Sequence, residues 1–338
     1  MNWAIPRFPP RSAHRAGASS ATVLVPGGIE RLTGGNLYDG FMIDALRNRG
    51  WWVTVADEQP RPDVDVVIQD SLSIPAGPPE GKTPLVALLH QIPSEVGGED
   101  RRAEDAVLQR ASVVIAVSDH IAAAVSARTG ARVVVISPGW DRAWARLRND
   151  DAEVLCVANA TPVKAIPDAL EAFRRANLDD ATFTLVGDAQ RDQSEWETIR
   201  VAASSESSGV VLSGILPPDE LAERYAAARV MLSASRYEGW PIAMAEAMAS
   251  GVPVVAFDAP GIRELVRDGV DGLLVEPGDV DSLAAALRGL WGAPALRSRM
   301  GLEARRRARA WPTWKSSSAR FVEVIEALVA DAQPATSR

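Results

Sequence analysis

Residues 235–255 read SRYEGWPIAMAEAMASGVPVV, and they run from the end of a short apolar segment at residues 230–233 into a second one at residues 254–257. Apolar segments of this length, bounded by turn residues, are typical of buried strands, whereas the sequence between them has the composition of a helix. Pro241 suits the first turn of that helix and Gly251 suits its end, because proline fixes a helical φ and glycine accepts a left-handed cap. The stretch therefore predicts a strand, a loop, a helix and a second strand, which is the repeating unit of a parallel α/β sheet.

The same alternation of apolar segments and helical segments extends over nearly all of the 338 residues and predicts two series of strands. The first series comprises residues 22–26, 52–56, 64–68, 85–90, 113–117 and 133–136, and the second comprises residues 154–158, 182–186, 210–213, 230–233, 254–257 and 272–275. The expected fold class is therefore α/β, with two Rossmann-like domains that face each other across a cleft. Parallel sheets bind ligands beyond the carboxyl ends of their strands, so functional residues are expected in the loops that follow the strands.

Length and local composition indicate where the domains begin and end. At about 150 residues per domain, the chain predicts two domains. Residues 1–20 are rich in Pro, Arg, Ser and Ala and are expected to form a disordered tail, with contact to a membrane surface or an anionic partner as the alternative. The N-terminal domain is expected at residues 21–145 and the C-terminal domain at residues 146–312. Residues 313–332 are expected to form a helix that packs back on the first domain.

Composition disfavours several classes of function. The chain has 36 Lys and Arg residues and 44 Asp and Glu residues, which gives a net charge of −8. This acidic balance argues against a nucleic-acid binder. The single cysteine, Cys156, has no partner for an internal disulfide, and three histidines are too few for a Cys/His zinc site, so we expect no metal and a reducing cytoplasmic location. No apolar segment approaches the ~18 residues that a membrane-spanning helix needs.

Three motifs imitate functional sites and are set aside. Asp63 with Asp65, and Asp279 with Asp281, resemble the paired aspartates of metal-dependent enzymes. The first pair leads into a strand, and Asp279 is placed to cap the following helix. Residues 77–83 imitate a phosphate-binding P-loop, but they have one residue too few between their glycines and precede a strand.

The informative chemistry is expected where the helix within residues 235–255 begins. Glu238 and Gly239 lie in the loop before this helix, and Glu246 lies in its second turn. The unpaired N–H groups at a helix start suit a phosphate, and Gly239 allows the backbone to approach it closely. Ionised carboxylates are strong acceptors for vicinal hydroxyl groups, so the combination indicates a sugar nucleotide. The alternative is that Glu246 is a solvated helix residue and Glu238 a loop charge.

The pattern Glu-x7-Glu formed by Glu238 and Glu246 resembles the signature of family-four retaining glycosyltransferases, the glycosyl transferases group 1, which have the GT-B fold. Further matching segments are spread along the chain: PGG at residues 26–28, TGGNLY at 33–38, AVS at 116–118, SPG at 137–139, LVGD at 185–188, GIRE at 261–264 and DGVDGLLV at 268–275. The resemblance therefore covers most of the chain.

The resemblance implies a role for each candidate residue. Glu238 would hold hydroxyl groups of the transferred sugar, and Glu246 would hold the ribose diol. Lys164 would neutralise the diphosphate, and His90 would lie near the donor sugar. The remaining candidates for donor binding are Gly28, Gly34, Gly35, Asn159, Gly239, Trp240 and Ile242. Asn159 stands where the family commonly has an arginine, so this loop would carry one cation fewer.

The implied activity is a metal-independent, retaining transfer of a hexosyl group. The donor would be a UDP-sugar or GDP-sugar, with no further cofactor, and the acceptor a glycan, a lipid or a small natural product bound mainly by the first domain. Two alternatives stay open: a non-catalytic protein that binds nucleotide sugars, and an epimerase or phosphorylase on the same fold. No nucleic-acid partner is expected, and the sequence does not decide the oligomeric state.

Overall fold

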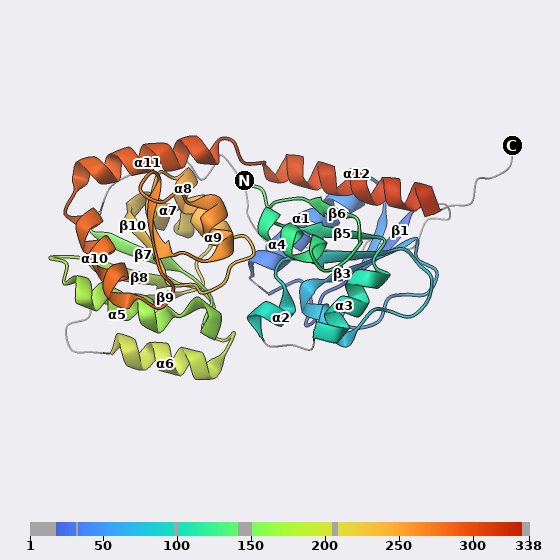
Figure 1. Cartoon of the computed structure of the whole chain (residues 1–338), viewed down its shortest axis with the longest axis horizontal. Coiled ribbons are helices and arrows are strands. Elements are labelled where there is room, and N and C mark those ends of the chain that lie inside the picture. The colour runs from blue at the N-terminus through green and yellow to red at the C-terminus, as the bar shows by residue number, and fades with distance from the viewer. Residues whose placement is uncertain (1–17, 32, 98–100, 141–150, 205–208, 333–338) are drawn as a thin grey trace, which may run out of the picture. The chain divides into compact units, whose positions relative to one another are not determined.

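The computed structural model describes residues 18–31, 33–97, 101–140, 151–204 and 209–332. The chain divides into two compact units: unit 1 comprises Met1–Gly139 and Pro312–Arg338, and unit 2 comprises Trp140–Trp311. Each unit is a six-stranded parallel sheet with helices packed on it (Figure 1). The predicted α/β class with two Rossmann-like domains is therefore confirmed.

Unit 1 is built on a sheet with the strand order β2-β1-β3-β4-β5-β6. The strands are β1 (Ser20–Leu24), β2 (Trp52–Ala56), β3 (Val66–Asp70), β4 (Leu85–Leu89), β5 (Val113–Ala116) and β6 (Val133–Val135). β1, β3, β4 and β5 are buried along their whole length, and β4 and β5 consist of apolar residues alone, as buried parallel strands often do. The strand order reverses between β1 and β3, and ligands of such sheets bind at this point, beyond the carboxyl ends of the strands.

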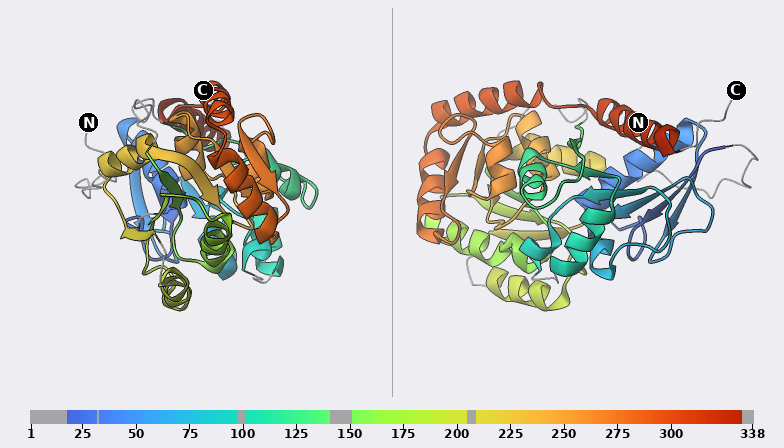
Figure 2. Two further views of the ribbon diagram at one scale, coloured as in Figure 1. Left: turned by 90° about the vertical axis from the view of Figure 1, so that its left-hand side faces the viewer. Right: turned by 45° about the vertical axis from the view of Figure 1, so that its right-hand side comes forward.

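The helices of unit 1 come from both ends of the chain. They are α1 (Gly34–Asn48), η1 (Ser71–Ala76), α2 (Pro93–Val96), α3 (Arg101–Arg110), α4 (Asp119–Ser126) and α12 (Trp314–Ala332). α12 lies alongside α1 (Figure 2), where the rings of Phe41 and Trp314 stack with centroids 4.2 Å apart. The Ser317 hydroxyl donates to the carbonyl of Ser137 over 2.7 Å. The C-terminal helix is thus part of the core of unit 1.

Unit 2 has the sheet order β12-β11-β10-β7-β8-β9. The strands are β7 (Glu153–Val157), β8 (Thr182–Val186), β9 (Val210–Gly214), β10 (Ala228–Ser233), β11 (Val254–Phe257) and β12 (Gly272–Val275). One apolar core joins the sheet to α5 (Ile166–Ala176), α6 (Gln193–Ala203) and α10 (Val280–Trp291). The other joins it to α7 (Pro218–Ala227), α8 (Ile242–Ala249) and α9 (Pro260–Leu265). Here the strand order reverses between β10 and β7.

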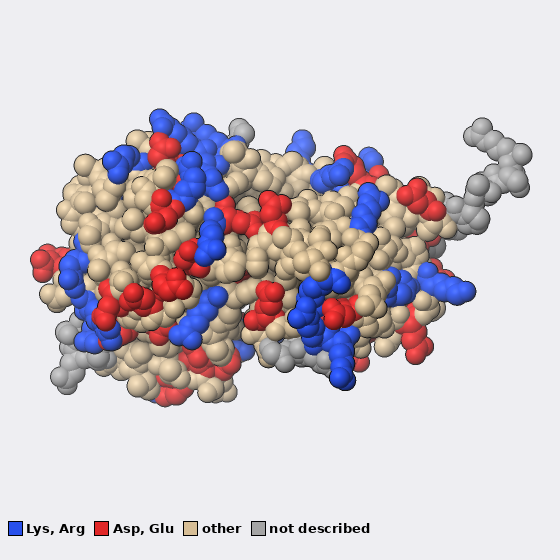
Figure 3. Space-filling model, viewed as in Figure 1, with Lys and Arg blue, Asp and Glu red and all other residues tan. Residues whose placement is uncertain are grey.

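Arginines of α11 (Pro294–Ala308) donate hydrogen bonds to the C-terminal ends of two other helices of unit 2. Basic side chains gather over this helix (Figure 3). Arg305 donates to the carbonyl of Ser250, just after α8, and Arg307 donates to the carbonyl of Leu265 at the end of α9. Because carbonyls at a helix end lack partners within the helix, these contacts satisfy them and hold α8 and α9 against α11.

All twelve predicted strands are present, with ends that shift by two residues at most. The expected end of the tail is wrong by one residue: Ser20 opens β1, and its N–H and hydroxyl both donate to Asp65. Residues 1–17, from the expected tail, and residues 141–150, around the expected domain boundary, lie outside the described residues. The units divide between Gly139 and Trp140, earlier than the expected boundary after residue 145.

The motifs that were set aside have structural explanations. Asp279 caps α10 and accepts from the N–H of Ser282 over 2.9 Å, as predicted. Gly77 ends η1, and residues 77–83 lead into β4 rather than into a helix. In the part of the chain that the structure describes, no helix is long and apolar enough to cross a membrane.

Candidate functional site

The centre of the candidate site in unit 2 is an ion pair between Lys164 and Glu238, whose Nζ and Oε1 atoms lie 2.7 Å apart. Lys164 ends η3 (Pro162–Lys164), which follows β7, and Glu238 lies in the loop after β10. β7 and β10 are neighbours at the point where the strand order reverses, so the pair lies where sheets of this kind bind ligands. The structure brings together two residues that are 74 positions apart in the sequence.

Further contacts join the loops that carry this pair. The N–H of Arg236 donates to the carbonyl of Val163 over 2.9 Å, and the Arg236 guanidinium pairs with Asp168 of α5 over 2.8 Å. Ala165 has a φ of 43°, in the left-handed region, where the chain turns from η3 into α5. The two loops therefore form one connected structure, in which the Lys164 and Glu238 side chains are 25% and 12% exposed.

Close packing of α9 sets the position of the Glu238 loop. A Cβ atom added at Gly261 would lie 2.0 Å from the carbonyl oxygen of Glu238 and 3.0 Å from that of Gly239. Contacts this short do not occur in folded proteins, so only glycine lets α9 begin against this loop. The sequence resemblance includes Gly261, and the structure supplies the physical reason for it.

Glu246 lies inside unit 2 rather than on a solvated helix face. It belongs to α8, is 7% exposed, and its Oε2 atom accepts from the Tyr225 hydroxyl over 2.9 Å. Burial raises the pKa of Glu246 to about 7, although the hydrogen bond from Tyr225 opposes the rise. The carboxyl can thus change its protonation state near neutral pH. Sequence analysis missed Tyr225; the available signal was a tyrosine on the apolar face of α7, since a buried tyrosine hydroxyl needs a partner.

Asn159 joins two loops of unit 2. Its side-chain oxygen accepts from the N–H of Asp188 over 2.8 Å, which connects the loop after β7 to the loop after β8. These loops touch closely, because a Cβ atom at Gly187 would lie 1.9 Å from the carbonyl oxygen of Ala158. The amide that stands in place of the family's arginine therefore has a structural role that arginine could not reproduce.

Three further candidates lie around the start of α8. Ile242 is its first residue, and Pro241 precedes it as the cap rather than as the first helical residue. The Trp240 ring meets the Trp311 ring edge-on, with centroids 6.2 Å apart. Gly239 is buried directly beside Glu238. The structure thus gathers Glu238, Gly239, Trp240 and Ile242 in one segment, while Trp240 also packs within unit 2.

A second cluster lies in unit 1, at the carboxyl ends of β3 and β4. The Nε2 atom of His90, which follows β4, lies 2.9 Å from Oδ1 of Asp39 and 3.1 Å from Oδ2 of Asp70. Burial alone would lower the pKa of His90, but the two carboxylates outweigh it and raise the pKa to about 10. Burial raises the pKa of Asp39 to about 6. Sequence analysis found His90 but missed both aspartates.

The glycine loop of unit 1 lies beside this cluster. Gly27 and Gly28 have φ values of 72° and 78°, which favour glycine, and the carbonyl of Gly28 accepts from the Asn36 side chain over 3.1 Å. Gly34 opens α1. A Cβ atom at Gly35 would lie 3.2 Å from Cδ2 of His90, so the small residue allows α1 to begin against the histidine ring.

A hollow of about 420 Å³ opens at the carboxyl ends of β1 and β2. It is lined by Pro26, Gly27, Asp57, Glu58, Leu72, Ser73, Pro75 and Ala76. The N–H of Gly27 donates to Asp57 over 2.9 Å, which fixes one wall. The lining combines two carboxylates with apolar side chains, a surface suited to a neutral or cationic molecule that carries hydroxyl groups.

Among the described residues, Asp39, Asp70 and His90 bring three potential ligand atoms within 4.8 Å of one another, a spacing that could hold a metal ion. A single proton on Nε2, shared between the two carboxylates, accounts for both short contacts without an ion. The described residues around Lys164 and Glu238 contain no comparable group.

Comparisons with known proteins agree with the geometry. Residues 151–292 match the model of the family "Glycosyl transferases group 1". The chain is 35% identical over 189 residues to an MMP alpha-(1->4)-mannosyltransferase of Mycolicibacterium hassiacum, with 55% of this chain and 44% of that protein covered. It is 32% identical over 235 residues to a D-inositol 3-phosphate glycosyltransferase of Geodermatophilus obscurus, with 61% of this chain and 50% of that protein covered. The chain therefore spans about half the length of these relatives.

Solved structures show the same architecture over nearly the whole chain. Sucrose-phosphate synthase of Thermosynechococcus elongatus superposes with a TM-score of 0.80 at 20% identity, covering 93% of this chain and 100% of that one. HepE of Anabaena, solved in complex with UDP and glucose, superposes with a TM-score of 0.77 at 20% identity, covering 91% and 100%. The resemblance found in the sequence is thus confirmed: the chain has the GT-B fold, and its residues 151–292 match the model of the glycosyl transferases group 1 family.

Proposed function

We propose that this protein is a retaining glycosyltransferase that moves a sugar from a nucleoside diphosphate donor to a hydroxyl group of an acceptor. The observation that carries the proposal is the Lys164–Glu238 pair at the carboxyl ends of β7 and β10. In this pair, the Lys164 ammonium group, which can bind the diphosphate, lies beside the Glu238 carboxylate, which can accept hydrogen bonds from sugar hydroxyl groups. The match of residues 151–292 to glycosyl transferases group 1 supports the same chemistry.

The donor binds to unit 2 in this proposal. Lys164 and the N–H groups at the start of α8 bind the diphosphate, since a helix start and a lysine both favour negative charge. Glu238 accepts hydrogen bonds from hydroxyl groups of the sugar, and Glu246 accepts them from the ribose diol. HepE was solved with UDP-glucose, which favours a uridine nucleotide as the first donor to examine.

The transfer needs no nucleophile from the protein. The bond between the anomeric carbon and the phosphate oxygen breaks while the acceptor oxygen bonds to the same face of that carbon. The acceptor's proton passes to the leaving phosphate oxygen, so atoms and charge balance. Negative charge grows on the diphosphate during this step, and Lys164 stabilises it through a fixed charge that is mostly shielded from solvent.

The acceptor binds to unit 1 in this proposal, and the hollow beside β1 and β2 is its candidate site. Asp57 and Glu58 are suited to accept hydrogen bonds from acceptor hydroxyl groups, and they disfavour an anionic group at this position. Gly28, Gly34, Gly35 and His90 lie at the same edge of the sheet and keep their assignment to the donor: the glycines to its diphosphate and His90 to its sugar.

Transfer is proposed to be independent of a divalent cation on the diphosphate, because Lys164 and the start of α8 supply the positive charge. Activity should then persist in excess chelator, and magnesium or manganese should not increase it. Loss of activity in chelator that returns with either ion would show that a metal carries the diphosphate instead.

A thermal-shift panel of free nucleoside diphosphates tests donor binding, followed by a transfer assay with the corresponding sugar nucleotide. A ligand that binds the folded state raises the melting temperature in proportion to its affinity and concentration. Stabilisation by UDP or GDP, lost in Lys164→Ala, is expected. No shift with any nucleoside diphosphate would contradict the proposal, and binding without transfer to any acceptor would favour a non-catalytic binding protein.

A further inference from the structure

His90 stands out in unit 1 because two carboxylates contact the same ring nitrogen. Oδ1 of Asp39 and Oδ2 of Asp70 both lie within 3.1 Å of Nε2. An imidazole nitrogen carries at most one proton, so both carboxylates share a single N–H donor. Two negative charges at this distance repel each other strongly unless a positive charge lies between them.

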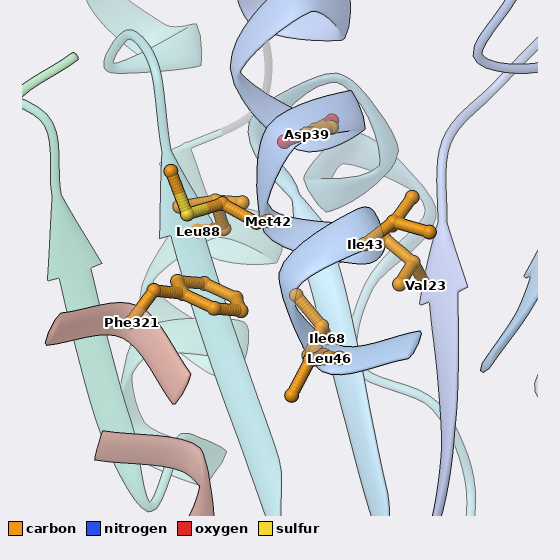
Figure 4. A pocket seen from close by; sticks show the side chains of 8 residues that line it. All are labelled: Val23, Asp39, Met42, Ile43, Leu46, Ile68, Leu88 and Phe321. Carbon is orange, nitrogen blue, oxygen red and sulfur yellow. The ribbon is translucent and has the colours of Figure 1, made fainter. Parts of the chain in front are cut away.

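Burial makes that repulsion costly. The side chains of Asp39 and Asp70 are 0% and 3% exposed, and that of His90 is 14% exposed. Figure 4 shows Asp39 on α1, one turn before Met42 and Ile43, at the edge of an apolar layer. Water therefore does little to stabilise the Asp39 carboxylate, and a buried charge of this kind requires an opposite charge in contact.

No other cation compensates the two aspartates within the described residues that pack on this ring. From α1, the Tyr38 ring meets the His90 ring edge-on, with centroids 5.2 Å apart, and burial raises the pKa of the Tyr38 hydroxyl well above its usual range, so it stays neutral. From η1, Ser71 offers its hydroxyl oxygen to the backbone N–H of His90. The two aspartates are the charged groups that face the ring, one from α1 and one from the end of β3.

We propose that Asp39 and Asp70 are positioning residues for His90: they hold its ring by Nε2 and keep it an imidazolium cation at neutral pH, which makes Nδ1–H a hydrogen-bond donor. The contacts of Asp39 and Asp70 with Nε2 also fix the orientation of the His90 ring, and Gly35 packs against Cδ2 of this ring. Nδ1–H is then available to an oxygen atom of a sugar or phosphate ligand at the carboxyl edge of the sheet. This ligand role rests on the proposed function, whereas the charge state of His90 does not.

This charge state means that His90 cannot act as a general base. A neutral histidine held through Nε2–H would offer a lone pair at Nδ1 and could accept a proton from the acceptor hydroxyl. An imidazolium cannot. This fits a transfer in which the leaving phosphate accepts the acceptor's proton, and it gives His90 the task of donating a hydrogen bond instead.

The charge state is measured by ¹⁵N NMR of the full, untagged chain with labelled histidine, from pH 6 to pH 10.5. The chain has three histidines, so His90→Gln assigns the His90 signals. We expect both ring nitrogens of His90 to stay protonated beyond pH 9. In Asp39→Asn and Asp70→Asn, which remove one charge but keep the shape, the titration should move to lower pH. Asp65→Asn is the matched control, because Asp65 binds Ser20 in the same unit and should leave His90 unchanged.

The pH profile of turnover tests the ligand role. On the alkaline side, wild-type turnover should decline where His90 loses its proton, in the strongly alkaline range. In Asp39→Asn this alkaline decline should move to lower pH together with the NMR titration, and in His90→Gln it should be absent while turnover is reduced throughout. A purely structural role of Asp39 would lower stability without moving the profile.

Two results would overturn the proposal. One is a wild-type His90 that titrates near the ordinary imidazole pKa of about 6.5, and this measurement decides the matter even if the variants fail to fold. The other is stoichiometric binding of added zinc or manganese that removes the Nε2 proton, which would make the cluster a metal site. If His90 is charged but the chain transfers no sugar, the proposed function fails and the positioning by Asp39 and Asp70 stands.

Discussion

At the scale of single residues, burial gives Glu246 a pH dependence that nucleotide binding should report. Its pKa lies near 7, so raising the pH from 6 to 8 converts the carboxyl from mostly neutral to mostly ionised. The ionised form is the stronger acceptor for a ribose diol. Affinity for a free nucleoside diphosphate should therefore rise over this range, and calorimetry at a series of pH values measures it.

Glu246→Gln separates this effect from the nucleotide's own titration. The phosphate also loses a proton near pH 6, but that contribution is present in both proteins. The difference between the two affinity curves should be largest on the alkaline side. Two parallel curves would show that Glu246 does not contact the nucleotide through its charge.

The two glutamates should affect binding and turnover differently. Glu246→Ala should weaken nucleotide binding, because it removes the buried carboxylate and the hydrogen bond that this carboxylate accepts from the Tyr225 hydroxyl. Glu238→Gln should leave binding of the free nucleotide nearly intact and lower turnover, since Glu238 is assigned to the transferred sugar. Calorimetry and steady-state kinetics measure the two effects. An equal loss of affinity in both variants would contradict the assignment.

Lys164→Ala should be the most damaging single substitution for turnover. Loss of a charge-assisted contact to the leaving diphosphate should cost roughly 3 kcal/mol of transition-state stabilisation, about a hundredfold in rate. The same variant leaves Glu238 without its ion-pair partner. Lys164→Ala with Glu238→Gln removes both charges and serves as the control for that effect. Near-normal turnover in the single variant would place the diphosphate elsewhere.

At the scale of elements, the order of strands explains what could and could not be predicted. The short apolar segments predicted all twelve strands, because strands of parallel sheets are rich in apolar and β-branched residues. The motif around Glu238 gave the loop before α8. Contacts between loops could not be predicted in this way, because they depend on the order of strands in the sheet. Lys164 contacts Glu238 because β7 lies beside β10. The family resemblance assigned Lys164 and Glu238 to different parts of one donor, but neither it nor the spacing of residues predicted their ion pair.

Residues on helices that contact the candidate site residues were harder to predict than site residues in the loops after strands. Asp39 lies within α1 and Tyr225 within α7, and both reach functional residues across the packing of a helix on its sheet. The helical pattern marks each as a core-facing position, where an apolar role is the usual one. Only the packed structure shows that Asp39 meets His90 and that Tyr225 meets Glu246.

The packing of α9 on the Glu238 loop predicts a sharp difference between two glycines. Gly261→Ala should force α9 away from Glu238 and lower both stability and turnover, because its Cβ would lie 2.0 Å from a backbone oxygen. Gly289→Ala in α10 meets nothing within 4 Å and should stabilise by about 0.5–1 kcal/mol, since alanine loses less entropy in a helix. Denaturant unfolding and turnover of both variants measure this. A harmless Gly261→Ala would show that the loop can move.

At the scale of the whole molecule, the chain crosses between the units twice, at Gly139–Trp140 and at Trp311–Pro312. Within unit 1 the first of these sites is tightly packed: a Cβ atom at Gly139 would lie 2.0 Å from the backbone nitrogen of Trp314. Both β1 and α12 therefore belong to unit 1, and α12 should stabilise unit 1 and not unit 2.

Trp314→Ala tests this division of stability. The Trp314 side chain is 6% exposed, stacks on Phe41 and meets Tyr38 edge-on, so its removal should cost unit 1 about 3–5 kcal/mol. Amide hydrogen exchange in the full chain should then become faster in β1, β3 and β4 and stay unchanged in β7 and β10, because exchange reports the stability of each cooperative unit. Trp291→Ala is the matched control: Trp291 packs in unit 2 under the Arg229 guanidinium, so it should accelerate exchange in β7 and β10 alone. If both substitutions accelerate exchange everywhere, the two units unfold as one, and α12 contributes to the stability of the whole chain.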